Sequence, residues 1–166
     1  TESSGSTDVA EGGAGDSYSV KLTTQPAANV TVTLVSGAQA TVNPTQLVFT
    51  PGNWNIPQDV AVTTVDDALA EGPHTATIQH SAASQDLNYN GIPVANLTVH
   101  ITDNDSPGVV VTESSGSTDV AEGGAGDSYS VKLTTQPAAN VTILLVSGAH
   151  ATANPTQLVF TPGNWN

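Results

Sequence analysis

The feature that most constrains the fold of this chain is an internal repeat. Thr1 recurs as Thr112, an offset of 111 residues, and the match continues to the last residue. The two copies differ at four of 55 positions: Val32/Ile143, Thr33/Leu144, Gln39/His150 and Val42/Ala153. We therefore expect a first repeat at 1–105 and the N-terminal half of a second repeat at 111–166. A short linker at 106–110 would contain the start of the first strand of the second repeat.

Near-identical copies indicate a recently expanded tandem array. Half a repeat would leave an open core and unpaired strand edges. We predict that the strands missing from the second copy are supplied by further sequence or by another chain.

Within one repeat, strand signals recur every 10–15 residues with turn residues between them. Apolar residues alternate with polar ones, and no helical periodicity competes with this period of two. The pattern predicts an all-β fold, a seven-stranded antiparallel β-sandwich. The expected strands cover 8–10, 17–23, 29–35, 46–50, 59–65, 75–80 and 96–102.

The chain is acidic, with fifteen Asp and Glu against two basic residues and a net charge of -13. This charge argues against binding to nucleic acid or to an anionic membrane, and no apolar run is long enough to span a bilayer. Cys is absent, so the domain must be held by its core, by a metal ion or by its neighbours. We also find no Gly-x-Ser-x-Gly elbow and expect no enzymatic activity.

If successive strands run up and down, the loops after strands one, three and five lie at one end, together with the end of strand seven. Six carboxylates would then gather there: Glu11, Asp66, Asp67, Glu71, Asp103 and Asp105. Crowded carboxylates repel one another unless a cation neutralises them, and Ca²⁺ accepts six to eight oxygen ligands from irregular loops. These residues are therefore a candidate Ca²⁺ site, with solvated turn residues as the alternative. In the second copy only Glu122 is present.

Four short motifs carry a family resemblance. They are Val9-Ala10-Glu11-Gly12, Phe49-Thr50-Pro51-Gly52, Val65-Asp66-Asp67-Ala68-Leu69-Ala70-Glu71-Gly72 and Ile101-Thr102-Asp103-Asn104-Asp105. In this order they resemble the Calx-beta domain, an immunoglobulin-like β-sandwich that occurs as tandem repeats in bacterial surface proteins. The resemblance implies that the same six acidic residues bind Ca²⁺. The loop at 36–41 lacks the acid that the family often has there, and Asn104 replaces an acid, so fewer ions or weaker binding are implied.

The remaining polar residues give weaker signals. His74, His80, His100 and His150 have no Cys or His partner at metal-ligand spacing, so we expect strand or turn residues rather than a zinc site. Trp54 and Tyr89 fall at the end opposite the acids.

These observations predict a structural repeat of an extracellular bacterial fibre or cell-surface protein. Bound Ca²⁺ would stiffen the junction between repeats, and the partners would be neighbouring repeats or other copies in a fibre. One alternative is an adhesin whose repeats bind glycan or another cell, around Trp54 and Tyr89. Another is a spacer beside a catalytic domain elsewhere.

Overall fold

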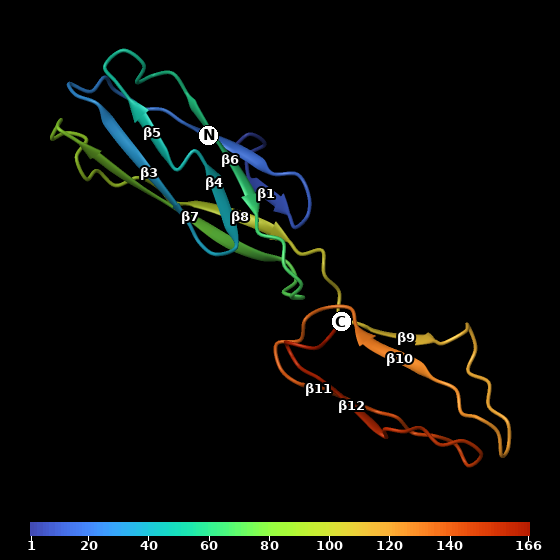
Figure 1. Cartoon of the computed structure of the whole chain (residues 1–166). Helices are drawn as coiled ribbons and strands as arrows, with labels where there is room; N and C mark the ends of the chain where they lie inside the picture. The colour runs from blue at the N-terminus through green and yellow to red at the C-terminus, as the bar shows by residue number, and fades with distance from the viewer. The chain divides into compact units, whose positions relative to one another are not determined.

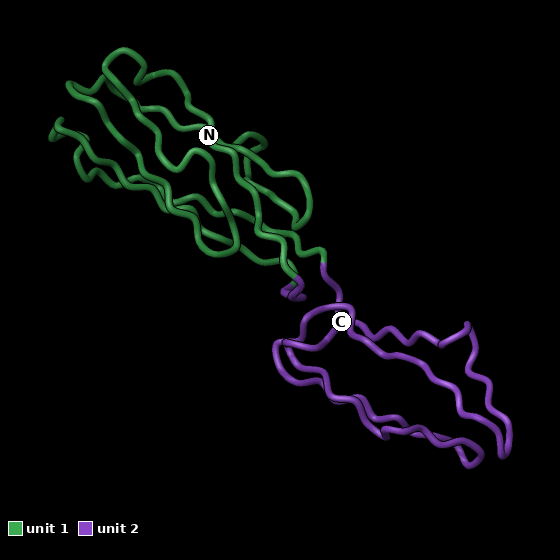
Figure 2. Tube along the Cα trace, in the orientation of Figure 1, with its two compact units in different colours: residues 1–67, 72–104 green, residues 68–71, 105–166 purple.

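The computed structural model describes all residues, 1–166, and every regular element in it is a β-strand. The chain divides into two compact units (Figure 2). Unit 1 comprises residues 1–67 and 72–104, and unit 2 comprises residues 68–71 and 105–166. No helix is long and apolar enough to cross a membrane.

Unit 1 contains eight strands in two sheets (Figure 1). The larger sheet has five strands in the order β1-β8-β7-β3-β5, and the smaller has three in the order β2-β6-β4. Their bounds are β1 (Thr7–Ala10), β2 (Asp16–Val20), β3 (Val30–Ser36), β4 (Ala40–Asn43), β5 (Gln46–Phe49), β6 (Gln58–Thr64), β7 (His74–Ser84) and β8 (Leu97–Thr102).

A single core lies between the two sheets. Alternate residues of β3, β6, β7 and β8 are buried, as a strand with one inward face requires. Fully buried side chains come from both sheets and include Val30, Phe49, Val60, Val62, Ile78 and Val99. Unit 1 is therefore a β-sandwich, as the period of two predicts.

Two details of the predicted fold are wrong. The sandwich has eight strands rather than seven, because β4 (Ala40–Asn43) pairs with β6 in the smaller sheet. Its pattern is only four residues long, with Ala40 and Val42 as its apolar positions, and this is too short to stand out in the sequence. The sandwich is also not wholly antiparallel, because β1 pairs with β8 in parallel, from Thr7↔Val99 to Ala10↔Thr102.

Unit 2 has four strands in two separate two-stranded sheets. One sheet pairs β9 (Val109–Glu113) with β10 (Tyr129–Leu133), and the other pairs β11 (Val141–Leu144) with β12 (Gln157–Phe160). Residues 118–121 and 151–154 are the counterparts of β1 and β4, with Ala153 in place of Val42, and they form no strand. In unit 1 those strands pair with β8 and β6, which have no second copy in this chain.

The sandwich is also tied by a hydrogen bond between its sheets. The Tyr18 hydroxyl on β2 lies 2.8 Å from His80 Nε2 on β7, and the two rings meet edge to face. His80 Nδ1 lies 2.9 Å from the Ala95 carbonyl, which can only accept. The Nδ1–H group therefore donates to Ala95, and Nε2 accepts the Tyr18 hydroxyl proton. Burial raises the pKa of Tyr18, and burial is also the main cause that lowers the pKa of His80.

A matched pair of glycines tests the difference between the units. A Cβ on Gly15 would collide with the Val62 carbonyl of β6, whereas a Cβ on Gly126 meets nothing within 4 Å. We expect Gly15→Ala to lower the free energy of unfolding of unit 1 by about 1–3 kcal/mol, because the backbone of β6 cannot yield easily. Gly126→Ala should leave the stability of unit 2 within about 0.5 kcal/mol. Urea unfolding of both full-length variants checks this, and equal losses would contradict it.

His80 predicts a pH dependence. Its folded-state pKa lies below the unfolded value of about 6.5, so the unfolded chain takes up the proton first. The stability contributed by neutral His80 is therefore complete above about pH 6.5 and is lost as pH falls through the folded-state pKa. We expect the melting temperature of unit 1 to fall from pH 7.5 to 5.5, and this fall to shrink in His80→Gln. Exposed His100 supplies the control, since His100→Gln should keep the wild-type slope.

Candidate metal centre

The parallel pairing of β1 with β8 makes both strands end at the same place. Ala10 is opposite Thr102, and the Glu11 amide donates to the Thr102 carbonyl at 3.0 Å. Glu11 and Asp103 therefore leave the sheet side by side. Glu11 is only 4% exposed, and such burial of a carboxylate requires compensation by hydrogen bonds, by charge partners or by a metal ion.

Two acidic groups are built around Glu11. Ligand atoms of Glu11, Asp103 and Asp105 all lie within 4.8 Å of one another. The same holds for Glu11, Glu71 and His74. Asp103 is further positioned by the Gly72 amide, which donates to its Oδ2 at 2.6 Å. Glu11 is the residue that both groups share.

Asn104 joins this cluster to the loop after β6. Its Nδ2 group donates to the Glu11 carbonyl and to Asp66 Oδ1, both at 3.1 Å. Gly12 permits this approach. Its φ of +62° suits glycine, and an added Cβ would meet the Asn104 amide at 3.1 Å. The uncharged Asn104 side chain thus links the loop after β1 to the loop after β6.

The predicted residues do not all share one position. Glu11, Asp103 and Asp105 form one group, Glu71 lies with Glu11 in the other, and Asp66 is attached through Asn104. The structure does not place Asp67 in either group. Glu122 of the second copy is likewise outside both groups and is exposed, since the chain holds no second copy of 56–105.

His74 is the residue of this site that the sequence analysis missed. It begins β7, three positions after Glu71. The sequence predicts only a strand or turn residue here, because no Cys or His partner lies at metal-ligand spacing. Its Nδ1 lies 2.8 Å from the Gly72 carbonyl and therefore carries the donated proton. The spacing Glu71-Gly72-Pro73-His74 was the available signal, but only the turn before β7 brings this imidazole back toward Glu11.

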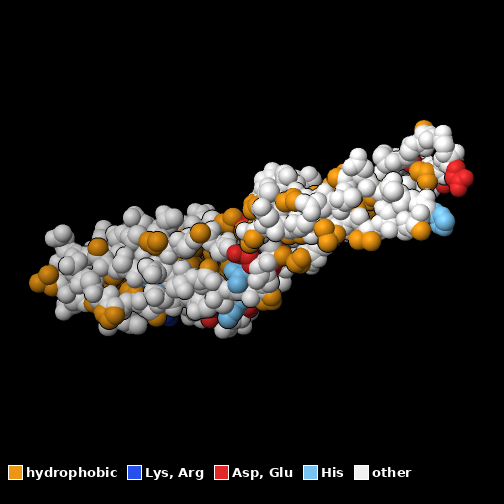
Figure 3. All heavy atoms as spheres, turned by 90° about the horizontal axis from the view of Figure 1, so that it is seen from below, with side chains coloured by type: hydrophobic (Ala, Val, Ile, Leu, Met, Phe, Trp, Pro, Cys, Tyr) orange, Lys and Arg blue, Asp and Glu red, His pale blue; other side chains and the backbone are white.

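Carboxylate oxygens and an imidazole nitrogen at this spacing can hold a metal ion. The group of Glu11, Asp103 and Asp105 offers oxygen alone, which suits hard cations, whereas the group with His74 adds a nitrogen ligand. In the space-filling view, acidic and histidine side chains lie beside one another in two separate places on a face that is otherwise mostly uncharged (Figure 3).

The loop that contains Tyr89 is held by hydrogen bonds within the protein. The Asp86 side chain accepts the Ala27 amide at 2.8 Å and the Asn88 amide at 3.0 Å, and these bonds lower the Asp86 pKa. Tyr89 is 7% exposed, and its hydroxyl donates a hydrogen bond to the Thr24 carbonyl. Trp54 packs against the core. Tyr89 therefore offers no open ring on which a sugar could stack.

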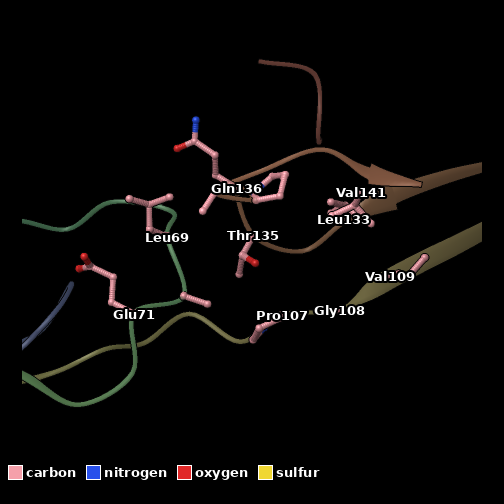
Figure 4. A pocket seen from close by; sticks show the side chains of 12 residues that line it. Leu69, Glu71, Pro107, Gly108, Val109, Leu133, Thr135, Gln136 and Val141 are labelled. Atoms are coloured by element: carbon pink, nitrogen blue, oxygen red, sulfur yellow. The ribbon is translucent and has the colours of Figure 1, made fainter. Parts of the chain in front are cut away.

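A pocket in unit 2 is mainly apolar (Figure 4). Leu69, Pro107, Leu133 and Val141 contribute to its lining, and the Gln136 amide donates to the Ala68 carbonyl at 2.7 Å. Glu71 is its sole titratable residue. This pocket has no pair of acid and base groups and so offers no catalytic constellation.

No family model and no curated protein matches the sequence. Among solved structures, the chain is similar to SSP-19, an MSP-domain protein like family member in Caenorhabditis elegans, with 18% identity and a TM-score of 0.37. This similarity covers 62% of the present chain and 97% of the other. The resemblance to Calx-beta domains stays a prediction from the four motifs.

The two hydrogen bonds of Asn104 predict its contribution to stability. We expect Asn104→Ala to lower the free energy of unfolding of unit 1 by about 1–3 kcal/mol, because the Glu11 carbonyl and Asp66 lose a shared donor. Urea unfolding in chelator measures this without any metal contribution. Asn96→Ala removes an amide from an exposed position and should change little. Equal effects of the two substitutions would contradict the assignment.

Proposed function

We propose that this chain is a structural repeat module of an extracellular bacterial fibre or surface protein, stabilised by Ca²⁺ at the acidic cluster around Glu11. The observation that carries the proposal is the group of Glu11, Asp103 and Asp105. Its oxygens lie within 4.8 Å of one another around a buried glutamate. Three carboxylates at this spacing favour a bound cation, because each raises the cost of ionising the others.

Ca²⁺ suits this group better than the other common ions. All three side chains supply hard oxygen ligands from loops, and Ca²⁺ accepts irregular geometry with waters and carbonyls completing its shell. Mg²⁺ demands a nearly ideal octahedron and keeps its waters, while Zn²⁺ prefers nitrogen and sulfur. Only Lys21 and Lys132 carry a permanent positive charge, so the side chains of this protein supply little charge to neutralise the carboxylates.

The structural role is supported by the repeat itself. A fibre or stalk needs many copies of one module, and the two copies here are nearly identical. Asp103 and Asp105 immediately precede Ser106-Pro107-Gly108, the start of the linker. An ion on these carboxylates would fix the end of β8 and shorten the free linker, and Pro107 restricts it further.

Thermal melting of the full chain during a Ca²⁺ titration tests the proposal. At 100 times the dissociation constant a bound ion adds about 2.7 kcal/mol, which for a domain of this size is a rise on the order of 10 °C. The rise should saturate, reverse with chelator and exceed the effect of NaCl at equal ionic strength.

Two substitutions of equal charge separate a site from general charge screening. Asp105→Asn should abolish most of the Ca²⁺-dependent rise, because it removes one of three ligands. Asp59→Asn, at an exposed position of β6, should keep the full rise. If both variants respond like the wild type, or Ca²⁺ acts no better than NaCl, the carboxylates are solvated turn residues and the metal role is excluded.

A further inference from the structure

The edge strands of an open sheet carry outward backbone groups that can pair with a strand of another chain. In the five-stranded sheet of unit 1, β5 is one of the two edges. Its hydrogen bonds to β3 alternate along the strand, and the Leu34 amide donates to the Thr45 carbonyl at 2.9 Å. The backbone groups of Gln46 and Val48 therefore point away from β3, toward the open edge.

Two side chains cover this edge at a single carbonyl. Gln58 Nε2 donates to the Val48 carbonyl at 2.8 Å, and Asn53 Nδ2 donates to the same oxygen at 3.5 Å. Gln58 is half-buried and begins β6, a strand of the smaller sheet. A side chain from one sheet thus occupies the outward carbonyl at the edge of the other.

The turn between β5 and β6 holds the second of these side chains in place. Asn53 Oδ1 accepts the Thr50 amide at 2.5 Å and the Thr50 hydroxyl at 3.1 Å. The Asn53 backbone amide also donates to the Thr50 carbonyl at 3.2 Å. Because Oδ1 is fixed on Thr50, Nδ2 is directed at the Val48 carbonyl.

The edge at β2, in the smaller sheet, is covered in a different way. There the Ser3 amide donates to the Ser17 carbonyl at 3.2 Å, and the Ser19 amide donates to the Thr1 carbonyl at 2.8 Å. Backbone pairing of this kind uses the edge groups directly. The Val48 carbonyl of β5 is instead covered by side chains.

We infer that the Gln58 side chain is an autoinhibitory cap that keeps the β5 edge from pairing with the same strand in a second copy of this chain. The sequence Gln46–Phe49 recurs as Gln157–Phe160, so each molecule carries this strand twice. Val48 is 45% exposed, and the strand contains no charged residue or proline that would disfavour pairing. An added strand would need the outward Val48 carbonyl that Gln58 occupies.

Sedimentation velocity of the full chain over a range of concentrations tests the inference, in chelator so that the acidic cluster plays no part. We expect Gln58→Ala to raise the association constant at least about tenfold, because each of two paired edges no longer has to give up a hydrogen bond. Hydrogen exchange of the associated variant should slow in the peptide that spans 42–49. Val42 distinguishes this peptide in mass from its counterpart, which has Ala153.

Gln25→Ala is the matched control. Gln25 Nε2 donates to the Pro51 carbonyl at 2.7 Å, a bond of the same kind that ends on a turn instead of a strand edge. Its association constant should stay within about twofold of the wild type, although the variant loses a similar hydrogen bond. Gln58→Ala/Gln46→Lys should return association to the wild-type level, because lysines on two paired edges repel each other.

Several outcomes would overturn the inference. They are a Gln58→Ala chain that associates no more than the wild type, equal association by Gln25→Ala, and slowed exchange that leaves the peptide 42–49 unchanged. Association that Gln46→Lys does not reverse would place the contact on another surface and would also exclude the cap. Urea unfolding of the two alanine variants checks that a difference in stability does not explain a difference in association.

Discussion

The parallel pairing of β1 with β8 is the interaction on which the rest of this structure depends. It joins the start of the repeat to its end, completes the five-stranded sheet and buries Val9 beside Ile101. It also makes the two strands end at one place, so that Glu11 meets Asp103. Parallel neighbours cannot be linked by a tight turn, so this pair joins two segments that are separated by most of the repeat. The acidic cluster is thus a consequence of closing the sandwich.

Unit 2 shows which interactions survive without that closure. The pairing of β11 with β12 repeats that of β3 with β5, and Ser114 donates to Asp127 at 2.6 Å as Ser3 donates to Asp16. These contacts join residues within one half of the repeat. The strands equivalent to β1 and β4 are absent, because their partners belong to the other half. One sequence therefore has local structure of its own and long-range structure that depends on a partner segment.

The site could be predicted in part from the order of strands alone. Alternating strand direction correctly brought Glu11, Asp103 and Asp105 to one end, even though the predicted strands were seven and not eight. That error was harmless because β4 and β5 run in the same direction and together make one crossing, as the single predicted strand does. The loop after β6 therefore still reaches Asn104 through Asp66. His74 was missed because its approach to Glu11 depends on the turn at Gly72 and Pro73, which strand counting does not describe. Whether Ca²⁺ occupies the cluster remains a proposal.

The sequence by itself determined the repeat, the all-β class and most strand positions, because alternation of apolar residues and the placement of turn residues are local properties. It also placed the acids in loops. Only the tertiary structure decided that β1 runs parallel to β8, that β4 joins the smaller sheet, and that His74 and Asn104 belong to the acidic cluster. Each of these depends on pairings between residues far apart in the chain, and their free energy comes from burial that no single segment can achieve.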